Sequence, residues 1–272
     1  MYVNGMWMRF IGQRLLQTLP VLMGVSLIVF LTMHLTPGDP LEHMLGQAGS
    51  ITQEQIDALR NHYALDRPII VQYGLFAQNA LRGDFGLSYS HHGRPVLDVI
   101  AERFPATLEL TFVSLIIALI LSIPAGAIAS LRPHGLFDRG ATVAALLGFS
   151  LPGFWLGIML MIVFGLRLRW LPISGRIDFA FALQPITGIY TLDALLTVNS
   201  VTLWNSLKHL ILPSVTMAAP MLAIVMRMVR SSMIGVLSHD YVQFARAKGV
   251  PEVIIIVKHA LKNALIPTVN IV

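Results

Sequence analysis

Residues Leu110–Leu131 read LTFVSLIIALILSIPAGAIASL and contain no Asp, Glu, Lys or Arg. A helix needs roughly 20 apolar residues to cross a hydrocarbon core of about 30 Å, and this stretch reaches that length. The same four residue types are absent from Leu15–Leu35, Ala141–Leu166 and Leu210–Met226. Soluble helices rarely run so long without a charge, so buried helices of a soluble core are strongly disfavoured. The sequence predicts an all-α, polytopic transmembrane helix bundle.

The composition supports this fold class. Charged residues make up 12% of the chain, against about 25% in an average soluble domain. The chain has no cysteine, which excludes disulfides, thiolate metal sites and cysteine nucleophiles. The net charge of +5 does not indicate nucleic-acid binding, because Lys and Arg of membrane proteins collect in particular loops. The first apolar run is too long for a cleaved signal peptide and lacks a small-residue cleavage site.

Charge placement predicts the topology. Arg9 and Arg14 precede the first span, and Lys and Arg are denser in the segments that would then be internal, so we expect a cytoplasmic N-terminus. The expected layout is a cytoplasmic N-terminus (1–10), a first span (11–35), an external segment with short helices (36–106), a second span (107–131), a cytoplasmic loop (132–139), a third span (140–166), an external loop (167–208), a fourth span (209–230), a cytoplasmic segment (231–262) and the start of a fifth span (263–272).

The two external segments differ in their signals. Thr52 and Gln55 fit a capping box, which predicts a polar helix as far as about Tyr63. A semi-amphipathic stretch follows over Ile69–Leu81. The second external segment, 167–208, is interrupted by Pro and Gly and predicts an irregular loop with little regular structure.

Small residues and prolines recur within the spans. Two rows have helix-packing spacing and favour close approach of neighbouring helices: Gly153 with Gly157, and Ser122 with Gly126 and Ser130. Proline removes a helix hydrogen bond, so we expect kinks or breaks at Pro124, Pro152, Pro213 and Pro220. Broken helices often surround a translocation path.

The segment after the fourth span predicts a helix–glycine–helix elbow. Ser238 is a plausible N-cap, Asp240 suits a positive helix start, and Gly249 is a natural stop. Pro251 then fits the first turn of a second helix with an apolar body, Val253–Leu261, and basic residues at its end. An exposed surface that is apolar and basic indicates a cytoplasmic partner.

The two halves of this elbow carry a family resemblance. DYVQFARAKG at 240–249, followed by KHALKNALIP at 258–267, resembles the cytoplasmic signature of ABC importer permeases of the dipeptide, oligopeptide and nickel branch, and dipeptide permeases most. Other pieces agree in order: PGDP at 37–40, GDFGLS at 83–88, ATLEL at 106–110, WLPISG at 170–175 and RMVRSSM at 227–233. The resemblance covers essentially the whole chain.

The resemblance implies a type I importer permease in the bacterial inner (plasma) membrane. Its expected partners are a second homologous permease subunit, two cytoplasmic ABC ATPase subunits, an external solute-binding protein and membrane lipid, with no nucleic acid. ATP and Mg would be bound by the ATPase subunits, and this chain would hold no cofactor and catalyse nothing. Family members continue beyond the fifth span's start, so the chain is expected to be C-terminally truncated.

The resemblance also assigns residues. Gln243, Phe244 and Ala245 occupy the E-A-A positions of the permease signature, and Gln243 and Phe244 depart from its consensus. The ATPase-coupling residues expected within 231–262 are Asp240, Tyr241, Gln243, Phe244, Ala245, Ala247 and Gly249. No Lys in the chain follows a Gly, so a G-K-[ST] phosphate loop is absent and energy must come from a partner.

Other residues carry two interpretations each. Glu109, Met217 and Met221 are candidates for the transport path or a subunit interface, with helix packing as the alternative. His34 and the pair His91-His92 are expected to be interfacial or solvated. We predict no catalytic and no metal site. Alternatives remain: the same architecture importing nickel, glutathione or another small solute, a secondary transporter, or a membrane-embedded enzyme.

Overall fold

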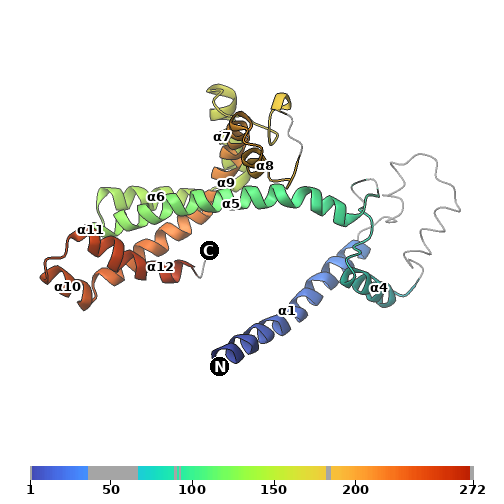
Figure 1. The fold of residues 1–272 in the computed structure, drawn as a ribbon, viewed down its shortest axis with the longest axis horizontal. Coiled ribbons are helices and arrows are strands. Elements are labelled where there is room, and N and C mark those ends of the chain that lie inside the picture. Colours follow the sequence, from blue (N-terminus) through green and yellow to red (C-terminus); the bar gives the residue numbers. More distant parts are fainter. Residues whose placement is uncertain (1, 36–66, 89–90, 92, 182–184, 270–272) are drawn as a thin grey trace. The chain divides into compact units, whose positions relative to one another are not determined.

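A computed structural model describes residues 2–35, 67–88, 91, 93–181 and 185–269, and these residues form helices and no strand (Figure 1). The predicted all-α class is therefore confirmed. The capping box at Thr52, the PGDP motif at 37–40 and His92 lie outside the described residues. The elements are α1 (Tyr2–Leu35), α4 (Ile69–Leu81), α5 (Val96–Leu131), α6 (Leu136–Ser150), α7 (Gly153–Leu160), the π-helix η1 (Met161–Arg167), the 3-10 helix η2 (Phe179–Phe181), α8 (Tyr190–Leu196), α9 (Ser200–Leu237), α10 (Asp240–Ala247), α11 (Glu252–Ile254), the π-helix η3 (Ile255–Leu261) and α12 (Lys262–Val269).

Three described helices are long and apolar enough to cross a membrane: α1 over Arg9–Thr32, α5 and α9. A fourth crossing is possible only if α6 and the α7–η1 segment count as one span, because the two are bent by 107°. The break expected at Pro152 is therefore present, and it divides the span expected over 140–166. Pro152 lacks an N–H and pushes Leu151 into an extended conformation, with ψ at 132°, so α6 ends there.

The other span prolines do not end their helices. Pro124 lies inside α5, and Pro213 and Pro220 lie inside α9. Neighbouring helices and local adjustments can satisfy the backbone groups that a membrane proline frees, so a proline alone does not fix a helix end. Both helices also outrun their apolar windows. The helix α5 begins at Val96, ahead of the span expected over 107–131, and α9 covers 200–237, beyond the span expected over 209–230 at both ends.

The chain divides into two compact units, 1–102 and 103–272, and each is described by itself. In the first unit α4 packs on α1 through aromatic and polar contacts. The Tyr73 hydroxyl lies 2.9 Å from the Ser26 hydroxyl, and the Phe30 ring contacts Tyr73 edge-on at 5.4 Å. His34 Nε2 lies 2.9 Å from Gln72 Oε1, so this histidine helps to hold α4.

In the second unit the long helix α9 is the element on which α6, α7, α8 and α12 pack. Small residues allow the closest approach. A Cβ on Gly126 of α5 would lie 2.6 Å from the Met226 carbonyl oxygen of α9, and Ser122 and Ser130 on the same row are buried. The prediction that this row mediates helix packing is confirmed. The buried core is formed mainly by Ala127, Val225, Val229, Met233, Ala260 and Ala264.

Candidate coupling site

The predicted elbow is present at the end of α9. The helix α10 (240–247) is followed by Gly249 with a φ of +74°, and α11, η3 and α12 continue from Glu252. Glycine reaches this left-handed conformation at no steric cost, which explains its place in the turn. The N-cap differs from the prediction. His239, extended with ψ at 148°, precedes α10, and the Ser238 hydroxyl donates back to the Gly235 carbonyl at 2.7 Å.

One side of α10 is fixed to the rest of the unit. The Val242 side chain is completely buried. The Tyr241 hydroxyl accepts a hydrogen bond from Asn263 Nδ2 at 2.9 Å and donates to the His259 carbonyl at 3.3 Å. These contacts tie the first turn of α10 to η3 and α12, so Tyr241 has a structural role. The coupling role expected of it stays a prediction.

The other side of α10 is open. Phe244 keeps 62% of its surface exposed, and the Lys248 ammonium lies 4.4 Å from the centre of its ring. Gln243 and Ala247 are also exposed, whereas Ala245 is half-buried. An aromatic ring flanked by a cation and small residues therefore forms the outer surface of the elbow. Such a helix face fits the groove of a partner.

An ion pair closes the glycine turn. Arg246 donates to both carboxylate oxygens of Glu252, at 2.6 and 3.2 Å, from one side of Gly249 to the other. The hydrogen bonds from Arg246 hold the pKa of Glu252 below its usual value. A bidentate pair across a turn restricts the angle between the two helices. The pair therefore links the end of α10 to the start of α11.

A second ion pair, which sequence reasoning missed, joins α6 to α9. The guanidinium of Arg230 makes two hydrogen bonds to the Asp138 carboxylate, one of them from Nη2 at 2.6 Å, and the backbone amide of His134 donates a third at 2.8 Å. Asp138 is buried. The two partners are 92 residues apart in the chain. Sequence alone therefore did not connect them.

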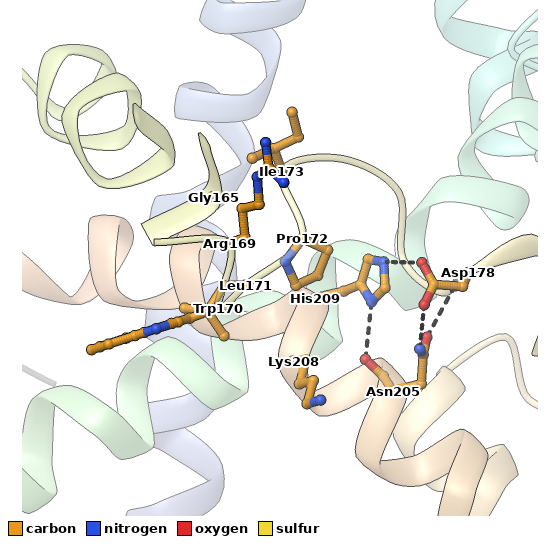
Figure 2. Close-up of a pocket in the computed structure, with 10 residues that line it drawn as sticks. All are labelled: Gly165, Arg169, Trp170, Leu171, Pro172, Ile173, Asp178, Asn205, Lys208 and His209. Atoms are coloured by element: carbon orange, nitrogen blue, oxygen red, sulfur yellow. Dashed lines mark hydrogen bonds and ion pairs between the residues drawn. The ribbon is translucent and has the colours of Figure 1, made fainter. Parts of the chain in front are cut away.

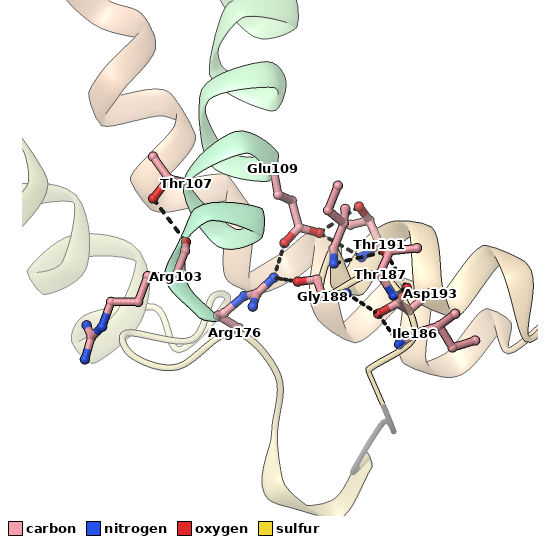
Figure 3. A network of polar contacts seen from close by, with 10 residues as sticks. Arg103, Thr107, Glu109, Arg176, Ile186, Thr187, Gly188, Thr191 and Asp193 are labelled. Atoms are coloured by element: carbon pink, nitrogen blue, oxygen red, sulfur yellow. Dashed lines mark hydrogen bonds and ion pairs between the residues drawn. The ribbon is translucent and has the colours of Figure 1, made fainter. Parts of the chain in front are cut away.

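Glu109 lies in a buried polar network at the start of the apolar part of α5 (Figure 3). Its carboxylate accepts hydrogen bonds from Arg176 Nη2, the Thr191 amide and the Thr191 hydroxyl, each at 2.7 Å. Arg176 also donates to the Gly188 carbonyl at 2.8 Å and lies 3.8 Å from the Tyr190 ring centre. These bonds support the packing interpretation of Glu109, because they hold the segment after η1 against α5.

The loop expected over 167–208 is more ordered than predicted. It contains α8 and the first turns of α9, and the fully buried Asp193 accepts hydrogen bonds from the amides of Ile186, Thr187 and Gly188 (Figure 3). Burial opposes ionisation of this carboxyl. Hydrogen bonds from the Thr187 hydroxyl and the three amides outweigh that effect and keep the pKa of Asp193 below its usual value. The Asp193 carboxylate thus satisfies the backbone amides of a segment that has no regular secondary structure.

A pocket of about 390 Å³ lies between the residues after η1 and the start of α9 (Figure 2). Buried His209 donates from Nδ1 to the Asn205 carbonyl oxygen at 2.9 Å, and its Nε2 lies 3.5 Å from Asp178 Oδ1. Asn205 Nδ2 donates to Asp178 Oδ2 at 2.5 Å. The pocket is lined by Gly165, Arg169, Trp170, Leu171, Pro172, Ile173, Asp178, Asn205, Lys208 and His209.

The three predicted path residues do not line this pocket. Met217 is half exposed and Met221 packs against the core of the second unit, so the two methionines and Glu109 are not gathered in it. Within the described ranges, no three His, Asp or Glu side chains are grouped as metal ligands. The features that the structure does unite are the elbow, the long helix α9 and its ion pair to α6.

Comparison with known proteins agrees with this arrangement. Residues 122–272 match the model of the binding-protein-dependent transport system inner membrane component, and residues 7–111 match that of the N-terminal part of such membrane components. The chain is 38% identical over 262 residues to a di/tripeptide transport system permease protein of Pseudomonas aeruginosa, covering 96% of this chain and 77% of that protein.

Two further relatives have similar names and coverage. A probable D,D-dipeptide transport system permease protein of Escherichia coli K12 is 40% identical, over 92% of this chain and 73% of its own length. An oligopeptide transport system permease protein of Bacillus subtilis 168 is 35% identical, over 96% and 77% respectively. By these matches, and with the elbow and apolar helices that its structure displays, the chain belongs to the family of binding-protein-dependent transport system inner membrane components.

Proposed function

We propose that this chain is the permease subunit of an ATP-driven importer that moves di- and oligopeptides from an external binding protein into the cytoplasm. Relatives at 35–40% identity are named as permeases for dipeptides, di/tripeptides or oligopeptides, which supports the substrate class. The observation that carries the proposal is the elbow, a rigid helix pair whose exposed face has no counterpart to cover it among the described residues.

The proposed partner at the elbow is an ABC ATPase subunit. Phe244 would enter an apolar groove of that subunit, with Gln243 and Ala247 beside it and Gly249 setting the turn. Asp240 and Ala245 complete the contact at the start and middle of α10. ATP and Mg would be bound by two such ATPase subunits, and this chain would contribute no catalytic residue and no cofactor site.

The family resemblance also suggests the other members of the proposed complex. A second homologous permease subunit would complete the pore, an external solute-binding protein would deliver the peptide, and lipid would surround the apolar helices. The N-terminus of this chain would lie in the cytoplasm, on the side of the elbow. In that orientation the Glu109 and Asp193 networks would lie on the external side.

The mechanism is a population shift between outward- and inward-open states. Closure of the ATPase pair would displace α10, which the Tyr241 and Arg246 contacts hold firmly to the following helices. Only residues 238 and 239 separate α10 from α9, so the displacement would pass into α9 and, through Arg230, into α6. The break at Pro152 is a place where the bundle can bend.

Two matched variants test the docking surface in the transporter reconstituted with all its subunits. Phe244→Asp places a charge on the exposed coupling face, whereas Leu136→Asp places the same charge on a 90%-exposed residue at the start of α6, outside the elbow. We expect Phe244→Asp to lose co-purified ATPase and peptide uptake, and Leu136→Asp to retain both. Normal assembly and uptake by Phe244→Asp would refute docking through this face.

The substrate class needs a separate measurement. Proteoliposomes containing the complex and its binding protein should take up a labelled dipeptide only with ATP inside, and vanadate should stop the uptake. Unlabelled tripeptide should compete, whereas free amino acids, nickel and glutathione should not. Uptake driven by an ion gradient without ATP would identify a secondary transporter instead, and competition by nickel or glutathione alone would identify another solute.

A further inference from the structure

A second pocket, of about 270 Å³, lies between α6 and α9 at the end of the bundle that carries the elbow. It is lined by Thr142, Ala145 and Leu146 of α6 and by Met226, Arg227 and Arg230 of α9. We propose that this pocket binds an anionic phospholipid, with its phosphate at the arginines and the start of an acyl chain against the apolar wall.

The position of the pocket fits a lipid. The charge-free stretch of α9 ends at Met226, and the charge-free stretch of the third span begins at Ala141. The pocket therefore straddles the boundary at which apolar sequence gives way to charged sequence. This boundary marks the level of the headgroups, because charged side chains are costly within the hydrocarbon. A molecule bound there must be polar at one end and apolar at the other.

The charge of the pocket selects an anion. Two arginines line it, but Arg230 is neutralised by its bidentate pair with buried Asp138. Arg227 is exposed and makes no ion pair or hydrogen bond with any residue that the structure describes. Arg139 is also exposed and lies three residues before Thr142, on the same face of α6. Arg227 is thus an uncompensated positive charge in the lining, and Arg139 lies one helical turn from the lining residue Thr142.

The chemistry of the lining distinguishes a lipid from a free anion. Arginine binds phosphate oxygens in a bidentate manner, and basic pockets between membrane helices recognise lipid headgroups. The remaining apolar wall offers no polar contact, and Leu146 in it is 57% exposed. This wall consists of Ala145, Leu146 and Met226. An inorganic phosphate would leave that wall unused, whereas an acyl chain would cover it.

The test uses the complete transporter, purified in detergent and exchanged into mixed micelles with either phosphatidylglycerol or phosphatidylcholine of identical acyl chains. Native mass spectrometry counts retained lipids, and thermal midpoints report stabilisation. We expect phosphatidylglycerol to be retained and to stabilise the complex, and Arg227→Gln to lower its retention about tenfold. Arg132→Gln is the matched control, because it removes the same charge at the same end of the bundle outside the pocket. It should leave retention unchanged.

A second variant, Leu146→Gln, keeps the charges and removes only the apolar contact, and it should lower retention of phosphatidylglycerol without affecting assembly. Equal loss in Arg227→Gln and Arg132→Gln, or equal retention of the two lipids, would overturn the proposal in favour of non-specific attraction. Stabilisation by inorganic phosphate alone would identify a free-anion site. Absence of retained phosphatidylglycerol in the assembled complex would overturn the proposal outright.

Discussion

Replacement of Gly126 by alanine tests how closely α5 and α9 approach. A Cβ at this position would lie 2.6 Å from the Met226 carbonyl oxygen and 2.9 Å from Val229 Cβ, whereas ordinary contacts begin at 3.4 Å. The helices must therefore separate locally by about 0.8 Å to restore normal contact distances. Inserting one methyl group into a packed core costs about 1–3 kcal/mol. This cost opposes the stabilisation that alanine, a better helix former than glycine, would otherwise give.

The magnitude is obtained by comparison with glycines that have free space. Gly140 of α6 and Gly235 of α9 are both inside helices, and nothing lies within 4 Å of a Cβ built on either. Alanine should stabilise these positions by about 0.5–1 kcal/mol, because glycine is the poorer helix former. Gly126→Ala should therefore be less stable than either control by about 1–3 kcal/mol, the overpacking cost alone.

The assay is thermal unfolding of the purified transporter, followed by intrinsic fluorescence or by loss of monodispersity. For domains of about 150–250 residues 1 kcal/mol corresponds to roughly 2–4 °C, so the midpoints should differ by several degrees. Gly126→Val should widen the difference further. If Gly126→Ala melts at or above the temperature of Gly140→Ala and Gly235→Ala, the two helices do not pack through this row and the reasoning fails.

Three further results are expected. Glu109→Gln should weaken the attachment of the external segment, because a neutral amide pairs poorly with Arg176, and limited proteolysis of the segment should become faster than in wild type. Asp138→Arg alone should impair assembly and uptake, and adding Arg230→Asp should restore part of both. If assembly and uptake of the double variant do not exceed those of the two single variants, the pair is not specific. The pKa of Glu252 is depressed in the folded elbow, so its contribution is present above the carboxyl's ordinary value of 4.5 and is lost as pH falls through the lower, folded value. Wild type should therefore lose more elbow protection from hydrogen exchange on acidification below pH 4.5 than Glu252→Gln does.

The elbow was predicted from local signals, and its glycine turn was found where the sequence placed it. Gly249 was identifiable because only glycine occupies a left-handed turn freely, and that preference is readable in one residue. The N-cap was missed by one residue, since His239 is held by backbone geometry rather than by a side-chain cap. The family signature added the coupling roles, which stay predictions until the variants above are measured.

Long-range pairing was not predictable in the same way. Asp138 and Arg230 are both charges at span ends, and many such charges face water or headgroups without a protein partner. The Glu109 network joins residues 67 and 82 positions apart, so no local spacing reveals it. Kinks or breaks were expected at four prolines, and a sharp break occurs at Pro152. The sequence did not show which of the four would end a helix, because that depends on the helices packed around each proline.

The sequence by itself determined that this protein is a helical membrane protein with a glycine elbow, because charge-free length and left-handed turns are properties of consecutive residues. Only the tertiary structure decided which helix pairs touch, which proline breaks a span, and which buried charges neutralise one another. Those outcomes depend on distances between segments far apart in the chain. Gly126 illustrates this difference. Its spacing from Ser122 and Ser130 predicted a packing row, but only the folded bundle brings the Met226 carbonyl oxygen within 2.6 Å of a Cβ built on Gly126.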